Sequence, residues 1–91
     1  MIQNNYYVYI STNRGRTVLY IGVTNNVEKR IAEHLQNKGN KRTFAGKLIY
    51  YEHFFDIKQA IQREKELKNL SRKKKENVIK QKNPGFNFLI I

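Results

Sequence analysis

The carboxylate of Glu64 is the side chain in this sequence that is best placed to do chemistry. On a helix the apolar residues Ala60, Ile61 and Leu67 share one face, and Glu64 falls near the centre of that face. Burying a bare carboxylate costs on the order of several kcal/mol, so the group must be protonated, paired or bound to a cation. An ion pair with Lys68 is worth only about 0.2–0.5 kcal/mol and does not explain a buried position. The spacing therefore predicts that Glu64 is functional.

Tyr20 and Gly22 form a second feature, in a predicted strand that ends at Asn25 and Asn26. Strand alternation places both residues on one face, so the missing side chain of Gly22 leaves a gap beside the Tyr20 phenol. A ligand could approach there, and a bulge or a tight packing site explains the pattern equally well.

Arg30 and His34 lie in the helix that is expected next, over Val27–Gln36, with Asn25 as its N-cap. Counted from Val27, they fall at about −60° and −20°, at one edge of the buried stripe. The Arg30 guanidinium either extends to water or points along the strand toward a cleft, and position alone favours the first alternative.

Basic residues dominate the charge of the chain. Lys and Arg number 18 against seven acids, a formal charge of +11, which favours a polyanionic partner such as nucleic acid. A basic loop is expected over Asn37–Gly46. A helix capped by Ser71 begins with four cations, which the helix dipole disfavours at that end but which together with the helix N-terminus would bind phosphate. A merely solvated loop or helix face is the alternative. The residues predicted to contact nucleic acid are Lys38, Lys41, Arg42, Lys47, Arg72, Lys73, Lys74 and Lys75.

Three runs rich in aromatic and β-branched residues predict strands over Tyr6–Ser11, Val18–Val23 and Leu48–Phe55. The first two form a hairpin whose turn is Asn13–Arg16. Alternation predicts an apolar face on this hairpin and an opposite face that collects Tyr7, Tyr9 and Tyr20. His53 has no second His or Cys at a metal-ligand spacing, so it is expected to be structural or to face solvent.

Two helices are expected after the third strand. Asp56 caps the first of them, and the second runs from Ser71 to about Lys82, where Asn83-Pro84-Gly85 ends it. The tail Phe86–Ile91 is too apolar to remain in water and is expected to dock on the core.

Length and composition restrict the class of protein. The 91 residues suffice for one domain, 1–91, with a single core. The sequence has no cysteine, no window that would span a membrane and no secretory signal pattern, so a cytoplasmic protein of bacterial type that binds no membrane is the simplest expectation.

The order and spacing of these residues resemble the GIY-YIG nuclease family. The match covers nearly the whole chain and is similar to the small stand-alone bacterial members, for which the stretches Arg63–Lys68 and Asn83–Asn87 are typical. Tyr7 stands where the name-giving glycine is found, and Val23 stands where some members carry lysine. The matching positions are Tyr7-Val8-Tyr9, Tyr20-Ile21-Gly22, Arg30, His34, Glu64 and Asn87.

The resemblance implies an α+β fold, a three-stranded antiparallel sheet flanked by helices in the order β-β-α-β-α-α, with a phosphodiester-hydrolysing site at the sheet edge. Tyr9 and Tyr20 would be paired phenols, one of which assists deprotonation of the attacking water. A phenol, with an ordinary pKa of about 10, acts as a base only beside cations. In the remaining family roles Arg30 stabilises the phosphate, His34 transfers a proton or positions substrate, Glu64 holds the metal and Asn87 supports the site.

Two functions are consistent with this sequence. The first is a metal-dependent endonuclease that cuts DNA, including branched or damaged DNA, with Mg²⁺ or Mn²⁺ held by one carboxylate, waters and substrate phosphate. The second is a nucleic-acid-binding module of the same fold that does not cut, or that cuts only with a partner protein that supplies specificity. DNA is favoured over RNA as the bound nucleic acid.

Overall fold

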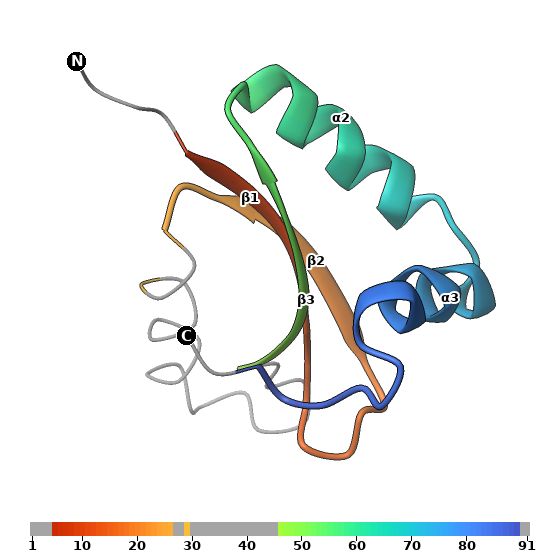
Figure 1. Cartoon of the computed structure of the whole chain (residues 1–91). Helices are drawn as coiled ribbons and strands as arrows, with labels where there is room; N and C mark the ends of the chain where they lie inside the picture. Colours follow the sequence, from red (N-terminus) through yellow and green to blue (C-terminus); the bar gives the residue numbers. More distant parts are fainter. Residues whose placement is uncertain (1–4, 27–28, 30–45, 90–91) are drawn as a thin grey trace.

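The structure, a computed structural model, describes residues 5–26, 29 and 46–89 (Figure 1). The predicted strands and the two later helices are confirmed, with bounds that differ by one or two residues. The helix expected over Val27–Gln36 lies outside the described residues except for Lys29, which is helical. The described elements are β1 (Tyr6–Thr12), β2 (Leu19–Thr24), β3 (Lys47–Phe54), α2 (Ile57–Lys68) and α3 (Arg72–Lys82).

The three strands form one antiparallel sheet in the order β2-β1-β3, so β1 is central and both of its neighbours are edge strands. Tyr9 of β1 lies opposite Gly22 of β2 and Tyr51 of β3. A register shift between Ile10 and Ser11 places an irregularity in the pairing with β3. The α+β fold with a three-stranded antiparallel sheet is thus confirmed.

The two faces of the sheet have different surroundings. Figure 1 shows α2 and α3 on the same side of the sheet, which we call the helix-covered face. Val8 and Ile10 point to this face, and both are fully buried. The side chains that alternate to the other side form the tyrosine face, which comprises Tyr7, Tyr9, Ser11, Tyr20, Gly22, Tyr51 and His53.

The main core lies between the helices and the helix-covered face. Ala60 and Leu67 of α2 pack on Val8, and Ile79 of α3 packs with Ile10. These side chains have no exposed surface, and each buried large apolar group contributes about 1.5–3 kcal/mol. The packing therefore fixes how both helices lie on the sheet.

Both helices begin at the predicted caps. The Asp56 carboxylate accepts a hydrogen bond from the Lys58 N–H (2.9 Å), and the Ser71 hydroxyl accepts one from the Lys74 N–H (3.3 Å). Each bond satisfies an N–H that a helix leaves unpaired at its first turn. In the described part of the chain, neither helix is long and apolar enough to cross a bilayer.

The tail after α3 returns to the sheet, as predicted. The Leu89 N–H donates to the Leu48 carbonyl (2.8 Å), and Phe86 and Phe88 pack on the Ile10 cluster. The tail thus packs against the start of β3. Ile90 and Ile91 lie outside the described residues.

Candidate active site

The Tyr9 ring lies directly over Gly22 on the tyrosine face. A Cβ atom added at residue 22 would be 2.6 Å from the Tyr9 Oη and 2.7 Å from Cζ, closer than van der Waals contact allows. Of the two interpretations of Gly22, the structure supports the tight packing site, because the Tyr9 ring from the neighbouring strand fills the space in which a ligand could have approached. Only glycine leaves room for that ring, which is 4% exposed.

Tyr20 is the accessible phenol of the pair. It lies opposite Ser11, one pairing step along the same face from Tyr9 and Gly22, which makes the two tyrosines diagonal neighbours. Tyr20 is 39% exposed, whereas Tyr9 is buried. The predicted pairing of these two phenols on one face is confirmed.

Glu64 lies at the border of the buried stripe of α2 and not at its centre. Ala60 and Leu67 are fully buried, but Ile61 is 40% exposed, so the buried stripe is displaced from the face that the sequence predicts. The Glu64 side chain is 21% exposed, and its Oε2 lies 3.5 Å from the Lys68 Nζ. The carboxylate is accessible from solvent and has a single cationic neighbour among the described ion pairs.

The side of α2 that carries Glu64 faces β2. Ile57 lies seven residues before Glu64 and on nearly the same helical direction, about 20° away. Ile57 lines a hollow together with Val23 and Thr24 of β2. Arg63, about 100° from Glu64 around the helix, instead contacts Glu52 of β3. Glu64 is therefore directed toward β2 from the helix-covered face, whereas Tyr20 of the same strand points to the opposite, tyrosine face, so the sheet does not bring these two side chains together on one face.

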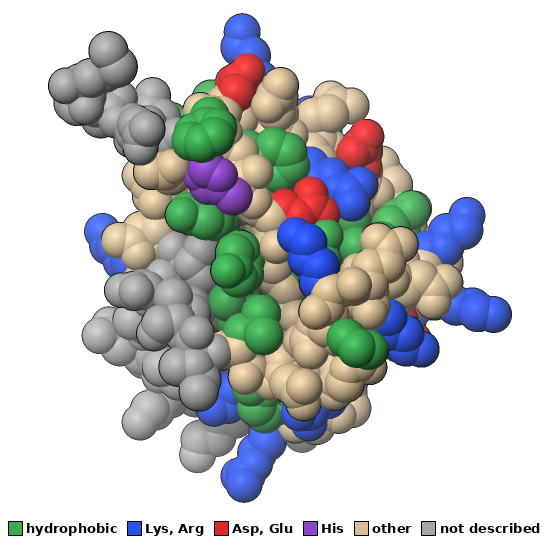
Figure 2. Space-filling view, viewed as in Figure 1, with side chains coloured by type: hydrophobic (Ala, Val, Ile, Leu, Met, Phe, Trp, Pro, Cys, Tyr) green, Lys and Arg blue, Asp and Glu red, His purple; other side chains and the backbone are tan. Residues whose placement is uncertain are grey.

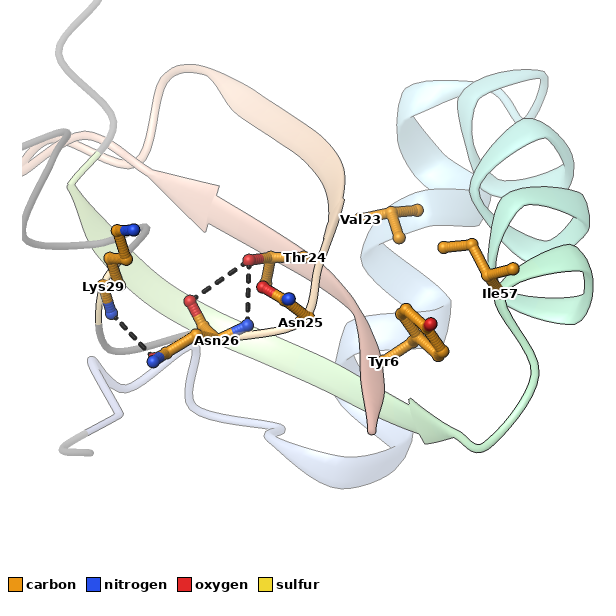
Figure 3. A pocket seen from close by; sticks show the side chains of 7 residues that line it. All are labelled: Tyr6, Val23, Thr24, Asn25, Asn26, Lys29 and Ile57. Carbon is orange, nitrogen blue, oxygen red and sulfur yellow. Dashed lines mark hydrogen bonds between the residues drawn. The ribbon is translucent and has the colours of Figure 1, made fainter. Parts of the chain in front are cut away.

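The hollow beside this edge has a volume of about 360 Å³ (Figure 3). Asn26 Oδ1 accepts a hydrogen bond from the Lys29 N–H (3.0 Å), three residues ahead, which is the bond of an N-cap. The cap predicted at Asn25 is thus made by Asn26, because Thr24 Oγ1 binds the Asn26 backbone and turns the chain one residue later. The lining residues are Tyr6, Val23, Thr24, Asn25, Asn26, Lys29 and Ile57.

Arg63 and Glu52 form a bidentate ion pair on the helix-covered face. Nε of Arg63 lies 3.0 Å from Oε1 of Glu52, Nη2 lies 3.0 Å from Oε2, and the Tyr50 hydroxyl also donates to this carboxylate. Burial raises the pKa of Glu52, but the hydrogen bonds from Arg63 and Tyr50 and the charges of Arg63 and Lys82 lower it by more. Burial, together with the hydrogen bond to Glu52, raises the pKa of Tyr50 to about 12. The sequence did not predict this ion pair between β3 and α2.

Asn83 and Asn87 organise the loop that follows α3. Asn83 is 7% exposed, and its Nδ2 donates to the carbonyls of Ile49 and Asn87, both at 2.8 Å. Its Oδ1 accepts from the Asn87 N–H (3.0 Å). Asn87 is itself exposed, with its side-chain amide beside Gly85. The Asn83-Pro84-Gly85 sequence predicted that the helix ends here. The hydrogen bond from the buried Asn83 side chain to the Ile49 carbonyl could not be predicted, because it depends on where β3 lies in the fold.

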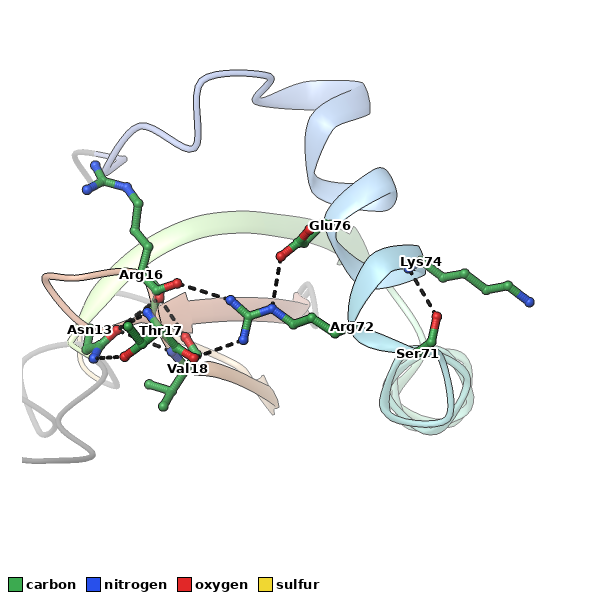
Figure 4. A network of polar contacts seen from close by, with 9 residues as sticks. Asn13, Arg16, Thr17, Val18, Ser71, Arg72, Lys74 and Glu76 are labelled. Atoms are coloured by element: carbon green, nitrogen blue, oxygen red, sulfur yellow. Dashed lines mark hydrogen bonds and ion pairs between the residues drawn. The ribbon is translucent and has the colours of Figure 1, made fainter.

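Arg72, predicted to contact nucleic acid, is held by the protein itself (Figure 4). Its Nη1 and Nη2 donate to the carbonyls of Thr17 and Arg16, and its Nε donates to Glu76 Oε2, each at 3.0 Å. The guanidinium thereby ties the start of α3 to the turn between β1 and β2. Arg72 thus has a structural contact that the sequence did not predict.

Arg16 joins the same turn to the tail. Its Nε donates to the Phe86 carbonyl (3.0 Å), and its guanidinium carbon lies 4.1 Å from the centre of the Phe88 ring. Its φ of 58° is the left-handed conformation, which a residue other than glycine adopts at a cost. The turn, α3 and the tail are therefore one connected unit at the end of the sheet where Tyr20 lies.

The other predicted site residues are only partly described. Arg30, His34, Lys38, Lys41 and Arg42 lie outside the described residues. Lys73 and Lys74 are exposed, and Lys75 is half-buried. The Lys47 ammonium lies 5.6 Å from the Phe88 ring centre, so its stem packs near the tail.

Glu64 meets the minimum requirement for a divalent cation. Among the described residues there is no group of three or more His, Cys, Asp or Glu side chains that could enclose a metal ion. A single accessible carboxylate still suits Mg²⁺ or Mn²⁺, because Mg²⁺ keeps several waters and uses substrate phosphate as a ligand. The donor set fits a cation that arrives with substrate.

Residues 5–77 match the family described as the GIY-YIG catalytic domain, and the chain belongs to the GIY-YIG family. It is 44% identical over 85 residues to a UPF0213 protein of Bacillus licheniformis, an alignment that covers 90% of this chain and 87% of that protein. A UPF0213 protein of Natronomonas pharaonis is 42% identical over 78 residues, covering 82% and 91%. The solution NMR structure of the UPF0213 protein BH0048 from Bacillus halodurans is 34% identical, with a TM-score of 0.59 and coverage of 90% and 89%.

Proposed function

We propose that this chain is a single-domain, metal-dependent endonuclease that hydrolyses phosphodiester bonds of DNA. The observation that carries the proposal is the pairing of an accessible phenol, Tyr20, with the Tyr9 ring packed on Gly22 in a chain of the GIY-YIG family. The formal charge of +11 supports a polyanionic substrate.

In this proposal the two tyrosines have separate roles. Tyr20, at the accessible β2 edge, assists deprotonation of the water that attacks phosphorus, and a nearby cation is needed for a phenol to do so. Tyr9, enclosed beside Gly22, holds the geometry of the pair. Arg30 stabilises the charge of the phosphate, and His34 transfers a proton or positions the substrate.

Glu64 is the residue proposed to hold the metal ion, and Asn87 is proposed to support the site. A bound Mg²⁺ or Mn²⁺ supplies charge stabilisation at the phosphate oxygens. Glu64 is directed toward β2, the strand of Tyr20, but from the opposite face of the sheet, so this role requires the substrate to reach both side chains around the β2 edge. The Lys68 ammonium, 3.5 Å from Glu64, would have to move aside when the cation binds.

The same ion pair favours a second candidate function. A Glu64 carboxylate that keeps Lys68 as its partner is already neutralised and would attract a cation weakly. In that case the domain binds DNA without cutting it, or it cuts only when a partner protein supplies the substrate geometry.

Incubation of the purified protein with supercoiled plasmid and with branched oligonucleotides tests the proposal. Nicking that needs Mg²⁺ or Mn²⁺ and stops with EDTA is the expected result. Binding without nicking on every substrate would instead establish the second function, and metal-independent nicking would remove Glu64 from its proposed role.

A further inference from the structure

Four aromatic side chains form a continuous row on the tyrosine face, which we call the aromatic stripe: Tyr7, Tyr51, His53 and Phe55. The ring centres of Tyr7 lie 6.1 Å from Tyr51 and 5.1 Å from His53, and His53 lies 4.5 Å from Phe55. The rings meet in edge-on or tilted arrangements, which are favourable for aromatic pairs. Strand alternation thus places the Tyr51 and His53 rings of β3 in a row with Phe55, the residue after β3, and Tyr7 lies beside them on β1.

Three of the four side chains in the aromatic stripe are exposed, and Tyr7 is half-buried. Tyr51 is 47% and Phe55 67% exposed, and His53 is exposed as well. Figure 2 shows hydrophobic side chains, in green, next to the histidine, in purple, on the visible surface. Large apolar side chains that cluster on the surface of a small domain mark a binding site.

The charge around the stripe favours an anionic occupant. Glu52 is the one acid in the three strands, and it points to the helix-covered face, where Arg63 holds it. Lys82 of α3 lies at the β3 edge, where its Nζ donates to the Tyr51 carbonyl (3.3 Å) and lies 5.3 Å from the centre of the Tyr50 ring on the helix-covered face. Asp56, the residue after Phe55, is an exposed acid next to the stripe, and its carboxylate accepts a hydrogen bond from the Lys58 N–H at the start of α2. Exposed aromatic faces with a cation at the adjoining strand edge suit nucleotides, whose bases stack and whose phosphates are negative.

We propose that the aromatic stripe stacks unpaired bases of the DNA substrate, so that the enzyme acts on DNA with a single-stranded segment. The inference rests on the proposed function and specifies its substrate class. In a duplex each base already stacks on its neighbours, whereas unpaired bases have free faces for Tyr51 and Phe55. Because Tyr51 lies opposite Tyr9 in the sheet, a strand held on the stripe leads toward the tyrosine pair.

A tryptophan reporter tests direct stacking. The chain contains no tryptophan, so Tyr51→Trp and Phe55→Trp each introduce a single fluorophore, and Ile61→Trp on α2 is the control at a position that is also exposed. The probes are an oligothymidylate, an abasic strand of the same length and a hairpin duplex, all in EDTA. The oligothymidylate should quench both stripe reporters and leave the Ile61 reporter unchanged, and the abasic strand should quench none.

Affinity measurements complete the test. Tyr51→Ala and Phe55→Ala should each weaken oligothymidylate binding by about fivefold or more in fluorescence anisotropy, and Ile61→Ala should leave it unchanged. Alanine variants that bind like wild type, or an abasic strand that binds as tightly as oligothymidylate, would overturn the proposal. So would sedimentation that shows a dimer of this chain which Phe55→Ala dissociates.

These measurements separate the stripe from catalysis. Binding is measured without metal, so a protein that stacks oligothymidylate and never nicks DNA contradicts the proposed function and leaves the stripe in place. A protein that nicks DNA while its alanine variants bind normally contradicts the stripe alone.

Discussion

Tyr9 and Gly22 face each other across β1 and β2 with no space between the ring and the backbone: a Cβ atom at residue 22 would lie 2.6 Å from the Tyr9 Oη. The ring is buried and cannot swing away without leaving its packing with Leu48. The position of the tyrosine pair therefore depends on a residue that has no side chain.

Gly22→Ala should displace the Tyr9 ring. Forcing a methyl group into a filled space costs about 1–3 kcal/mol, so both the free energy of unfolding and the nicking rate should fall. The matched control is Gly15→Ala, because the nearest atom to a Cβ there is 3.7 Å away, an ordinary contact. Urea unfolding and plasmid nicking measure the two effects; equal stability of the two variants would contradict the observed packing.

Glu64 and Glu66 are chemically identical and differ in their position on α2. Glu64→Gln keeps the shape and removes the charge that attracts a divalent cation, so nicking should disappear while DNA binding survives or tightens. Glu66, which is 52% exposed and 3.6 Å from Arg63, should tolerate replacement by Gln with normal nicking. Plasmid nicking and anisotropy with both variants check the prediction, and equal nicking would exclude Glu64 as the metal ligand.

Arg30→Lys should keep the charge and lose the planar guanidinium that can bind two phosphate oxygens. We expect nicking to fall at least about tenfold, a loss of roughly 1.4 kcal/mol of transition-state stabilisation, with little change in melting temperature. Single-turnover kinetics and thermal melts provide the measurement. Wild-type nicking by this variant would show that Arg30 is a surface residue.

Lys73, Lys74 and Lys75 should determine part of the salt dependence of binding. With roughly 4–7 phosphate contacts overall, log K should fall against log[salt] with a slope of about −0.9 for each contact. Replacing all three lysines by Ala should make the slope shallower. A charge-matched triple variant, Lys58→Ala, Lys65→Ala and Lys80→Ala, should keep the wild-type slope. If the two triple variants gave identical slopes, the first turn of α3 would not belong to the interface.

Glu52 should make folding sensitive to acid. Its pKa in the folded protein lies below the ordinary value of 4.5, so it contributes stability above that pH that is lost as the pH falls through the lowered pKa. Glu52→Gln should lower the free energy of unfolding by about 1–3 kcal/mol at neutral pH, and its difference from wild type should shrink in acid. Urea unfolding at successively lower pH measures this.

Glu66→Gln is the control for that experiment, because its pair with Arg63 is exposed and should change stability by less than about 0.5 kcal/mol. A difference between Glu52→Gln and wild type that stays constant with pH would show that the carboxylate charge does not contribute.

The sequence by itself determined the three strands, the two later helices and the two faces of the hairpin. Period-two alternation makes Val8 and Ile10 face one side and Tyr9 the other, and Asp56 and Ser71 carry the oxygen that a helix start needs. These are local properties, because a side chain's direction and a cap depend on residues only a few positions away.

The tertiary structure decided what depends on distant partners. Sequence spacing placed Glu64 in the centre of the α2 stripe, but the buried stripe follows Ala60 and Leu67, because α2 packs on Val8 and leaves Ile61 at the rim. Likewise a basic run predicted Arg72 as a phosphate contact, and only the fold brings the carbonyls of Thr17 and Arg16, 55 and 56 residues away, to 3.0 Å from its guanidinium. Helical periodicity gives relative directions around an axis, and the rotation of that axis against the sheet is set by packing between segments that are far apart in the chain.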